Sequence, residues 1–446
     1  MRIAMVAMSG VRAHNPELTA LGLTLPGFVE RGRTIAALPS LSLLTLAGMT
    51  PQRYEVSYHE VADLDDLNAL PECDLVAIAT YTAQAKEAYA LSDRFRAEDV
   101  RTVIGGLHAT SLPDEAAEHA DAVVVGEGEL SWLEVLDDAA AGRLAPRYAG
   151  VGEFELREAP MPRFDLLDPE RYNRLTVQTQ RGCPWRCEFC ASSILLTERY
   201  ELKPVDRVIE EIRAIKRIWN RPFIEFADDN SFVNKRRSRE LVEAIGHEGG
   251  VRWFTETDVS VAEDATLLAA MGAAGCVEVL IGFESPTAAG LDGIETRRNW
   301  KRRQLGRYRE AVGRIQEHGI AVNACLVLGL DGDDVGVFDA VEEFVDAVVP
   351  FDVQITVLTP FPATPLYDRL LAEGRILAPG AWERCTLFDV NFRPANMTVD
   401  QLEHGLVDLG RRLYSREATD RRRSGFKAQW RDGRASRHAA SLEPTP

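Results

Sequence analysis

The sequence predicts an α/β protein in which a doubly wound, Rossmann-like sheet precedes a partial (β/α)6 barrel and a small C-terminal helical extension. Short β-branched runs alternate with helical segments from Met1 to about Tyr148, and six further strand–helix repeats begin at Leu175. Such alternation is typical of parallel sheets covered by helices. We expect domains at 1–150, 175–378 and 379–414, a linker at 151–174 and a basic, disordered tail at 415–446.

Composition excludes several classes of protein. A chain of 446 residues, 46% hydrophobic and 27% charged, is long enough for two or three domains with substantial cores. Its 51 Lys and Arg against 69 Asp and Glu give a net charge of -18, which argues against nucleic acid as a partner.

No stretch predicts an integral membrane segment. The opening MRIAMVAMSG is too short for a secretory signal, and the apolar stretch 265–283 is interrupted by Glu278, Gly272 and Gly275. We therefore expect a cytoplasmic protein, in a compartment where thiols stay reduced.

In the first domain, the loops after the expected strands are the candidate binding elements, because doubly wound sheets bind ligands at the carboxyl ends of their strands. Paired glycines there let a phosphate or a flat ring approach closely, or simply form tight turns. The strands are expected at Arg2–Ala7, Tyr54–Tyr58, Leu75–Ala79, Thr102–Ile104 and Ala122–Val125. The loop residues are Thr80, Thr82, Gly105, Gly106, His108, Gly126 and Glu127.

In the second domain, six strands alternate with helices, which predicts a barrel or most of one. The strands are expected at Leu175–Gln180, Phe223–Ala227, Arg252–Thr257, Val277–Phe283, Ala321–Gly329 and Val353–Leu358. The helices are expected at Pro204–Trp219, Arg236–His247, Asp264–Ala274, Leu305–His318 and Asp334–Val348, with a further one at Val399–Tyr414. Parallel barrels place their chemistry on the loops after the strands.

The loop after the first barrel strand, RGCPWRCEFCASS, holds Cys183, Cys187 and Cys190. Three thiolates so spaced are able to share one iron-sulfur cube and leave one iron open. A zinc knuckle needs four ligands and no His lies near in sequence, and a disulfide with a spare thiol is the other alternative. The four remaining cysteines, Cys73, Cys276, Cys325 and Cys385, have no ligand spacing and are expected to be buried as small hydrophobes.

The three cysteines, with aromatic Phe189 before the last, resemble the signature of the radical S-adenosylmethionine (SAM) superfamily. Further segments are similar too: FADDN at 226–230, IGFES at 281–285, LGLD at 328–331 and TPFPATPL at 359–366. The resemblance implies a [4Fe-4S] cluster whose open iron binds SAM, an electron passed from the cluster, and cleavage to a 5'-deoxyadenosyl radical. An external reductant such as flavodoxin or ferredoxin is then expected as a partner.

The resemblance also suggests which residues bind SAM. Asp228 and Asp229 are expected to accept hydrogen bonds from its ammonium group, or else to form a turn or N-cap. Glu284 and Ser285 suit the ribose or methionine part, Gly282 permits close approach, and Phe189 is expected to line the adenine. Thr356 and Thr359 are candidates for the substrate cavity, whereas Cys325 is expected in the core. No residue is assigned a catalytic proton transfer.

The first domain resembles the cobalamin-binding domain that precedes many radical SAM barrels, through GGLHAT at 105–110 and VVGEGE at 124–129. The loop residues of the first domain would then contact cobalamin; the alternative is a retained fold without the cofactor. The motif Asp-x-His-x-x-Gly, which supplies a cobalt ligand in such domains, is absent, because Arg12 and Glu17 flank His14. No histidine of that motif is therefore expected on cobalt.

Methyl transfer to an unactivated carbon of a small-molecule or lipid substrate is the function that this resemblance favours. The alternatives are a radical rearrangement, cyclisation or carbon–carbon bond formation, and, from another class, a non-enzymatic electron-transfer protein. The basic stretch after Arg411 is expected to be solvated or disordered rather than a docking site for an acidic partner.

Overall fold

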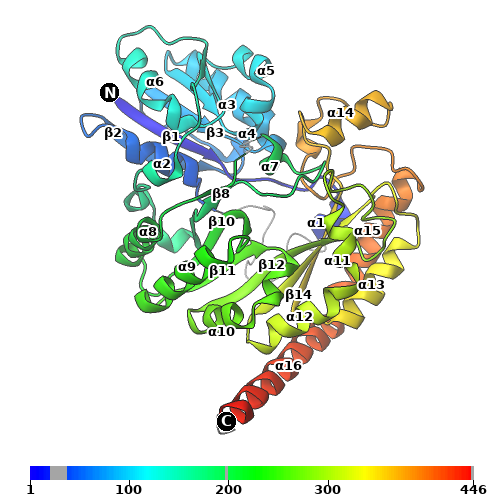
Figure 1. The fold of residues 1–446 in the computed structure, drawn as a ribbon. Coiled ribbons are helices and arrows are strands. Elements are labelled where there is room, and N and C mark those ends of the chain that lie inside the picture. Colours follow the sequence, from blue (N-terminus) through cyan, green and yellow to red (C-terminus); the bar gives the residue numbers. More distant parts are fainter. Residues whose placement is uncertain (21–37, 196–198, 443–446) are drawn as a thin grey trace.

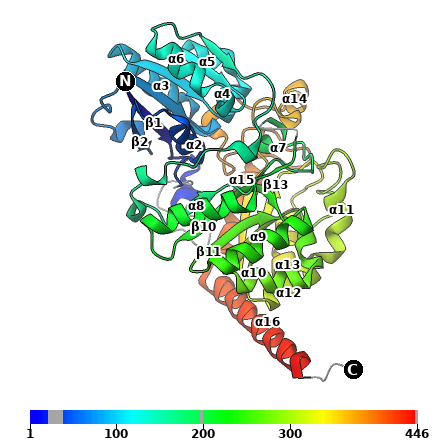
Figure 2. The same ribbon diagram turned by 60° about the vertical axis from the view of Figure 1, so that its left-hand side comes forward.

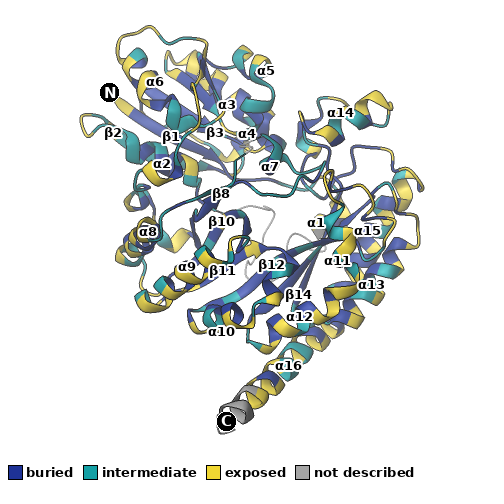
Figure 3. Cartoon of the chain, viewed as in Figure 1, coloured by how far each residue is buried: buried dark blue, intermediate teal, exposed yellow. Residues whose placement is uncertain are grey.

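The computed structural model describes residues 1–20, 38–195 and 199–442, and it contains two six-stranded parallel sheets in successive domains (Figure 1). The predicted α/β class and the order of the two sheets are confirmed. Strands of both sheets are mostly buried, while the outer faces of the helices are exposed (Figure 3).

The N-terminal sheet has the order β2-β1-β3-β4-β5-β6, and all its pairs are parallel. Its strands are β1 (Arg2–Met8), β2 (Glu55–Val61), β3 (Leu75–Ala79), β4 (Arg101–Gly105), β5 (Ala122–Val125) and β6 (Arg147–Ala149). The sequence indicated all but β6, whose three residues are too few to form a pattern. Strand order reverses between β1 and β3, and such a switch point is where doubly wound sheets bind ligands.

Alternation along β1 shows why the sheet is covered on both faces. Ile3, Met5 and Ala7 belong to one buried cluster, with α2 (Leu41–Met49) and α6 (Trp132–Ala140). Ala4, Val6 and Met8 belong to the other, to which α3 (Ala85–Ala97), α4 (Leu107–Ser111) and α5 (Pro113–Glu118) contribute. Both faces are apolar because helices cover each of them.

The second sheet is a partial barrel with the order β14-β13-β12-β11-β10-β7, all parallel, so that β14 and β7 form its two edges. Its strands are β7 (Leu175–Val177), β10 (Phe223–Ser231), β11 (Arg252–Thr257), β12 (Cys276–Glu284), β13 (Ala321–Leu328) and β14 (Asp352–Val357). The expected first strand is split, because β8 (Gln180–Arg181) turns away to pair with β9 (Glu201–Leu202).

Helices follow the barrel strands as the sequence indicates. They are α8 (Val205–Ile218), α9 (Lys235–Glu248), α10 (Ala265–Ala273), α12 (Tyr308–Glu317) and α13 (Val337–Val348). Side-chain caps explain where two of them begin: Asn234 accepts a hydrogen bond from the Arg237 amide, and Asp264 accepts one from the Leu267 amide. Shorter helices are α1 (Pro16–Ala20), α7 (Ala191–Leu195), α11 (Trp300–Gln304) and α14 (Pro365–Ala372).

The C-terminal tail differs from the expectation of disorder. After α15 (Val399–Leu413), which starts with a Thr398–Gln401 capping box, the chain forms α16 (Arg416–Leu442). This helix extends away from the body of the molecule (Figures 1 and 2). None of the helices in the described ranges is both long and apolar enough to cross a membrane.

The buried face of α16 explains why a basic sequence is ordered here. Arg422 is 2% exposed and donates to the Leu413 carbonyl at 2.6 Å. Phe426 packs edge-on against Phe351. A Cβ at Gly425 would lie 2.4 Å from Val349, so the helix approaches as closely as a glycine allows. The prediction of disorder was therefore wrong, because it considered the charge of the segment and not these buried contacts.

Candidate functional site

A cavity of about 360 Å³ lies inside the barrel, between the cysteine loop and the strands. It is large enough for a small-molecule ligand. Its wall includes side chains from the cysteine loop, four consecutive strands and α11. They are Cys183, Trp185, Cys187, Phe189, Cys190, Ser192, Ser193, Glu225, Phe226, Ala227, Asp228, Asp229, Asn230, Glu256, Thr257, Asp258, Leu280, Gly282, Glu284, Lys301 and Cys325.

The cysteine loop is fixed by contacts from distant parts of the barrel. Glu188 lies between two of the cysteines; its amide donates to the Ile294 carbonyl at 3.0 Å, and its carboxylate accepts two hydrogen bonds from Arg369. Cys187 forms an isolated antiparallel bridge with Glu295, whose carboxylate accepts three backbone amides. The long connection after β12 thus holds the loop that follows β7.

All three motif cysteines are free thiols on the cavity wall. Burial raises the pKa of Cys183 to about 11 and raises that of Cys187 further, so iron must displace their protons. Among the described residues, no three His, Cys, Asp or Glu side chains are grouped so that they could hold a single metal ion. A cluster shared by three cysteines places each sulfur on a different iron, and this donor set beside an open cavity fits such a cluster.

A hydrogen-bond network that the sequence did not indicate lies next to Cys183. Asp258 accepts from Trp185 Nε1 at 3.0 Å and from Asn230 Nδ2 at 2.9 Å. The same Asn230 nitrogen is 3.9 Å from the Cys183 sulfur. Trp185 also stacks on Trp300, with ring centroids 4.6 Å apart. The position of Asp258 directly after β11 is the sequence signal by which this network could have been found.

The two aspartates that the sequence proposed for SAM have different surroundings. Asp228 is 4% exposed, and its carboxylate accepts two hydrogen bonds from Thr179, one from the Gln180 amide and one from Ser231. Asp229 accepts one from the Gly182 amide at 3.0 Å and faces the cavity. Asp228 therefore anchors the start of the cysteine loop, and Asp229 retains acceptor capacity for a ligand.

Gly282 and Glu284 lie on β12 where the predicted ribose or methionine contacts were expected. A Cβ at Gly282 would be 2.5 Å from the Glu284 carboxylate, so only glycine leaves room for this arrangement. Glu284 has a positive φ of 63° and pairs with Lys301 Nζ at 2.5 Å. Burial by itself would lower the pKa of Lys301, but the Glu284 carboxylate and Cys187 raise it.

Other predicted residues are less uniformly placed. Phe189 lines the cavity, as does Cys325, which was expected in the core. Ser285 is fully buried and its hydroxyl accepts from the Thr287 amide, so it does not reach the cavity. Thr356 and Thr359 are buried and do not line it either. Cys73, Cys276 and Cys385 are buried as expected.

The loops at the carboxyl edge of the N-terminal sheet offer backbone rather than side chains. Thr80 and Thr82 are buried, and Thr80 donates to the Tyr81 carbonyl. Gly106 and Gly126 have φ angles of 101° and 80°, and a Cβ at Gly126 would meet nothing within 4 Å. Gly105, by contrast, packs within ordinary contact distance of Val124. Open backbone at such a loop fits the close approach of a flat ring.

His108 does not fit a direct contact with cobalamin. Its side chain is fully buried, 3.4 Å from the Glu115 carboxylate and edge-on to Trp382. Trp382 Nε1 in turn donates to Glu115 at 3.0 Å. Burial lowers the pKa of His108 and so favours the neutral ring, although the nearby Glu115 carboxylate acts in the opposite direction. The histidine ties the first domain to the C-terminal segment and faces away from the loop surface.

Glu127 connects the two domains. Its carboxylate and that of Glu129 both accept from the Arg181 guanidinium, at 2.6 and 2.7 Å, two residues before the first motif cysteine. Glu127 also accepts from the Phe154 amide at 2.8 Å. The loop predicted to contact cobalamin and the cysteine loop are therefore joined by ion pairs that separate inspection of the two motifs did not reveal.

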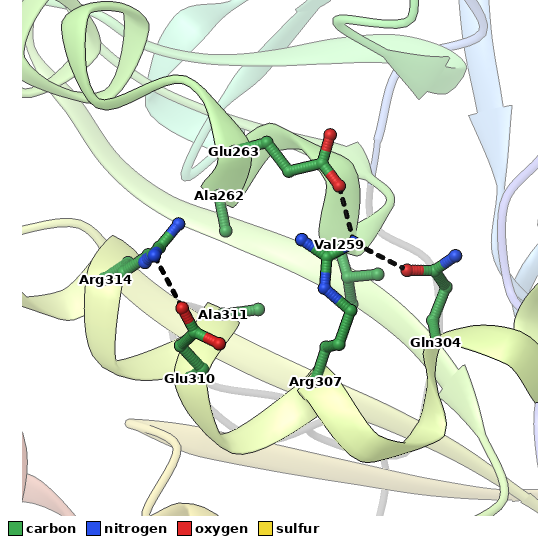
Figure 4. Close-up of a pocket in the computed structure, with 8 residues that line it drawn as sticks. All are labelled: Val259, Ala262, Glu263, Gln304, Arg307, Glu310, Ala311 and Arg314. Carbon is green, nitrogen blue, oxygen red and sulfur yellow. Dashed lines mark hydrogen bonds and ion pairs between the residues drawn. The ribbon is translucent and has the colours of Figure 1, made fainter.

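A second, smaller hollow lies outside the barrel, between residues 259–263 and α12 (Figure 4). Its charged groups pair with one another: Arg307 with Glu263 at 2.7 Å, and Arg314 with Glu310 at 2.5 Å. It is far smaller than the barrel cavity and contains none of the motif cysteines. The barrel cavity is therefore the candidate site.

Comparison with known families agrees with this geometry. Residues 177–345 match the model of the Radical SAM superfamily, and residues 36–136 match that of the B12 binding domain. This is a radical SAM enzyme with an N-terminal B12-binding domain. Residues 364–443 match a domain of unknown function, DUF4070, so the region containing α15 and α16 recurs in other proteins.

Among curated proteins, this radical SAM enzyme is 27% identical over 399 residues to bacteriochlorophyllide d C-12(1)-methyltransferase of Chlorobaculum tepidum, covering 87% of this chain and 86% of that one. It is 24% identical over 361 residues to hopanoid C-2 methylase of Rhodopseudomonas palustris, covering 77% and 66%. The fold is similar to that of the radical SAM methyltransferase TsrM from Kitasatospora setae, at 18% identity and a TM-score of 0.64, covering 85% and 78%.

Family membership implies a [4Fe-4S] cluster, SAM and cobalamin as cofactors. The donor set of three cysteines beside a cavity fits the cluster and SAM, and the open glycine backbone after β5 fits cobalamin. Sequence reasoning missed Glu225, Glu256 and Lys301 of the cavity wall. Alternation along the strands is the signal by which Glu225 and Glu256 could have been found, but Lys301 lies on a short helix with no such pattern.

Proposed function

We propose that this chain is a cobalamin-dependent methyltransferase that methylates an unactivated carbon of a small-molecule or lipid substrate. The observation that carries the proposal is the position of the three cysteines on a barrel cavity, tied by Arg181 to the loop after β5 of the B12-binding domain. Methyltransferases of a bacteriochlorophyllide and of hopanoids are among its relatives, which supports a large, apolar substrate.

The residues that would hold the cofactors follow from the site. Cys183, Cys187 and Cys190 would ligate the cluster, which when bound supplies the electron for SAM cleavage. Asp229 would accept from the SAM amino group, since Asp228 is already saturated by donors of this chain. The Glu284 carboxylate, held by Lys301, would face the ribose or methionine part.

The cysteine loop also excludes bulk water from one side of the cavity. Trp185 and Trp300 stack beside it, and Phe189 lines the inner wall. A radical on a carbon atom requires such shielding, because water and stray donors quench it. An external reductant such as flavodoxin or ferredoxin would deliver electrons, and the free thiols suit a reducing compartment such as the cytoplasm.

A second candidate retains the radical chemistry without methyl transfer. The anaerobic magnesium-protoporphyrin IX monomethyl ester cyclase of Cereibacter sphaeroides is 25% identical over 347 residues, covering 71% of this chain and 55% of that protein. A cyclisation is therefore the main competitor, and both candidates share the same cysteines and cavity.

Anaerobic purification with cobalamin supplied tests the proposal. The methyltransferase should retain corrinoid, visible in its absorption spectrum, and should cleave SAM to 5'-deoxyadenosine once the cluster is reduced. Absence of any corrinoid would contradict methyl transfer while leaving the cyclisation open. Absence of 5'-deoxyadenosine from a reconstituted, reduced cluster would instead favour an electron carrier.

A further inference from the structure

The barrel cavity holds more carboxylates than the proposed SAM contacts use. Among the described residues that line it, Lys301 is the only Lys or Arg. Most of the acids have partners within the chain: Glu284 pairs with Lys301, and Glu225 pairs with Arg174. The acidic residues of the wall are Glu225, Asp228, Asp229, Glu256, Asp258 and Glu284.

Glu256 is the exception. It lies on β11, opposite Leu280 of β12, and both side chains line the cavity. Its side chain is exposed, and it lines the cavity inside the barrel. Among the described residues, none forms a hydrogen bond or an ion pair with its carboxyl group. The group is therefore available to a ligand.

The electrostatic surroundings make a lone anion at this place unfavourable. Glu225, Asp228 and Asp229 face Glu256 from β10, and Glu284 faces it from β12. Lys301 of α11 and Cys325 of β13 also line the cavity. Desolvation of the carboxyl group within the cavity, reinforced by these carboxylates, raises the pKa of Glu256 to about 8. A positive charge entering the cavity would reverse this balance and favour the carboxylate.

We propose that Glu256 binds the positively charged sulfonium end of SAM and so selects SAM over S-adenosylhomocysteine, its neutral demethylated product. The inference rests on the proposed SAM site in this cavity. The two molecules share the amino, carboxylate, ribose and adenine groups, and only SAM carries the sulfonium charge. A methyltransferase gains from this selection, because its own product would otherwise occupy the site.

Proton linkage gives the proposal a signature that a structural role lacks. At pH 7 the free carboxyl is mostly protonated, and SAM binding would release its proton. SAM affinity should therefore rise about eightfold between pH 7 and pH 8.5, as the carboxylate fraction grows. Binding of S-adenosylhomocysteine should show no such rise from Glu256, because it offers no sulfonium charge.

Calorimetric titration of the full-length chain with a reconstituted cluster, kept anaerobic, tests this with SAM and S-adenosylhomocysteine as probes. At pH 8.5, Glu256→Gln should weaken SAM about tenfold and leave S-adenosylhomocysteine within twofold. In two buffers of different ionisation heat at pH 7, the variant should release nearly one proton fewer per SAM than the wild type. Protons from the SAM amino group are common to both proteins and cancel in this difference.

Glu263→Gln, an exposed glutamate outside the barrel, is the matched control and should bind both probes as the wild type does. Iron and sulfide content confirms that each variant carries the cluster. An unchanged ratio of SAM to S-adenosylhomocysteine affinity in Glu256→Gln would overturn the proposal and leave Glu256 to the substrate. Failure of methyl transfer appears separately, in corrinoid retention and product analysis, so the two proposals fail independently.

Discussion

The two parallel sheets present their carboxyl-end loops in opposite ways. In the barrel, the loop and strand side chains line an open cavity of about 360 Å³. In the N-terminal sheet, the corresponding side chains are already engaged: Thr80 with its neighbour, His108 with Glu115, and Glu127 with Arg181. The same topology therefore supports recognition by side chains in one domain and by glycine backbone in the other.

Removal of a cluster ligand should have the largest effect on the barrel side of this comparison. Cys187→Ala is expected to abolish iron and sulfide binding and SAM cleavage, because the remaining two thiolates do not hold the cluster. Metal analysis and 5'-deoxyadenosine formation measure this. Cys325→Ala, in the same cavity but outside the motif, should retain the cluster; intact iron and sulfide in Cys187→Ala would contradict the assignment.

The ion pairs between the domains should come next. Arg181→Met leaves Glu127 and Glu129 adjacent without a cation, and these two carboxylates are only 11–15% exposed. We expect unfolding to become easier by about 2 kcal/mol, seen in chemical denaturation. Arg236→Ala, which breaks an exposed pair with Glu240, should cost less than about 0.5 kcal/mol. Equal effects would mean that Arg181 is not a buried clamp.

Backbone recognition in the first domain is tested at its open glycine. Gly126→Val places a β-branched side chain at a φ of 80° on the surface where cobalamin is expected. Corrinoid affinity should fall about tenfold. Gly142→Val introduces similar strain at a φ of 68°, in the turn between α6 and β6. Its corrinoid affinity should match the wild type, and an equal loss would point to strain rather than contact. His108→Gln should leave the corrinoid spectrum unchanged.

The smallest expected effect concerns a buried carboxyl behind the barrel wall. Burial raises the pKa of Asp333 to about 7, and the residue is 2% exposed. Because its folded pKa is raised, wild-type stability falls as pH rises from about 4 through 7. Asp333→Asn should therefore gain about 1 kcal/mol over the wild type between pH 6 and pH 7 in thermal or chemical unfolding. Asp334→Asn, at an exposed neighbouring position, should show no such change.

Much of the fold followed from local pattern. Strand alternation and helix periodicity located β3 and β5 to the residue and the barrel helices to within a few residues. The misses have physical causes. The three residues of β6 are too few to show alternation. The residues of β8 lie outside the barrel sheet because they pair with β9 instead. The tail is a helix because Arg422 and Phe426 reach buried contacts despite their basic surroundings.

What the sequence by itself determined is the chemistry of the cysteine loop, since any compact loop brings three thiols within eight residues close together. Tertiary structure decided which other groups meet them. Asp228 and Asp229 are adjacent in sequence and both line the cavity, yet donors of this chain occupy the Asp228 carboxylate, whereas Asp229 accepts one hydrogen bond, from the Gly182 amide. The carboxylates that surround Glu256 come from other strands of the barrel. They interact with it only in the folded barrel, because they are distant from it in sequence.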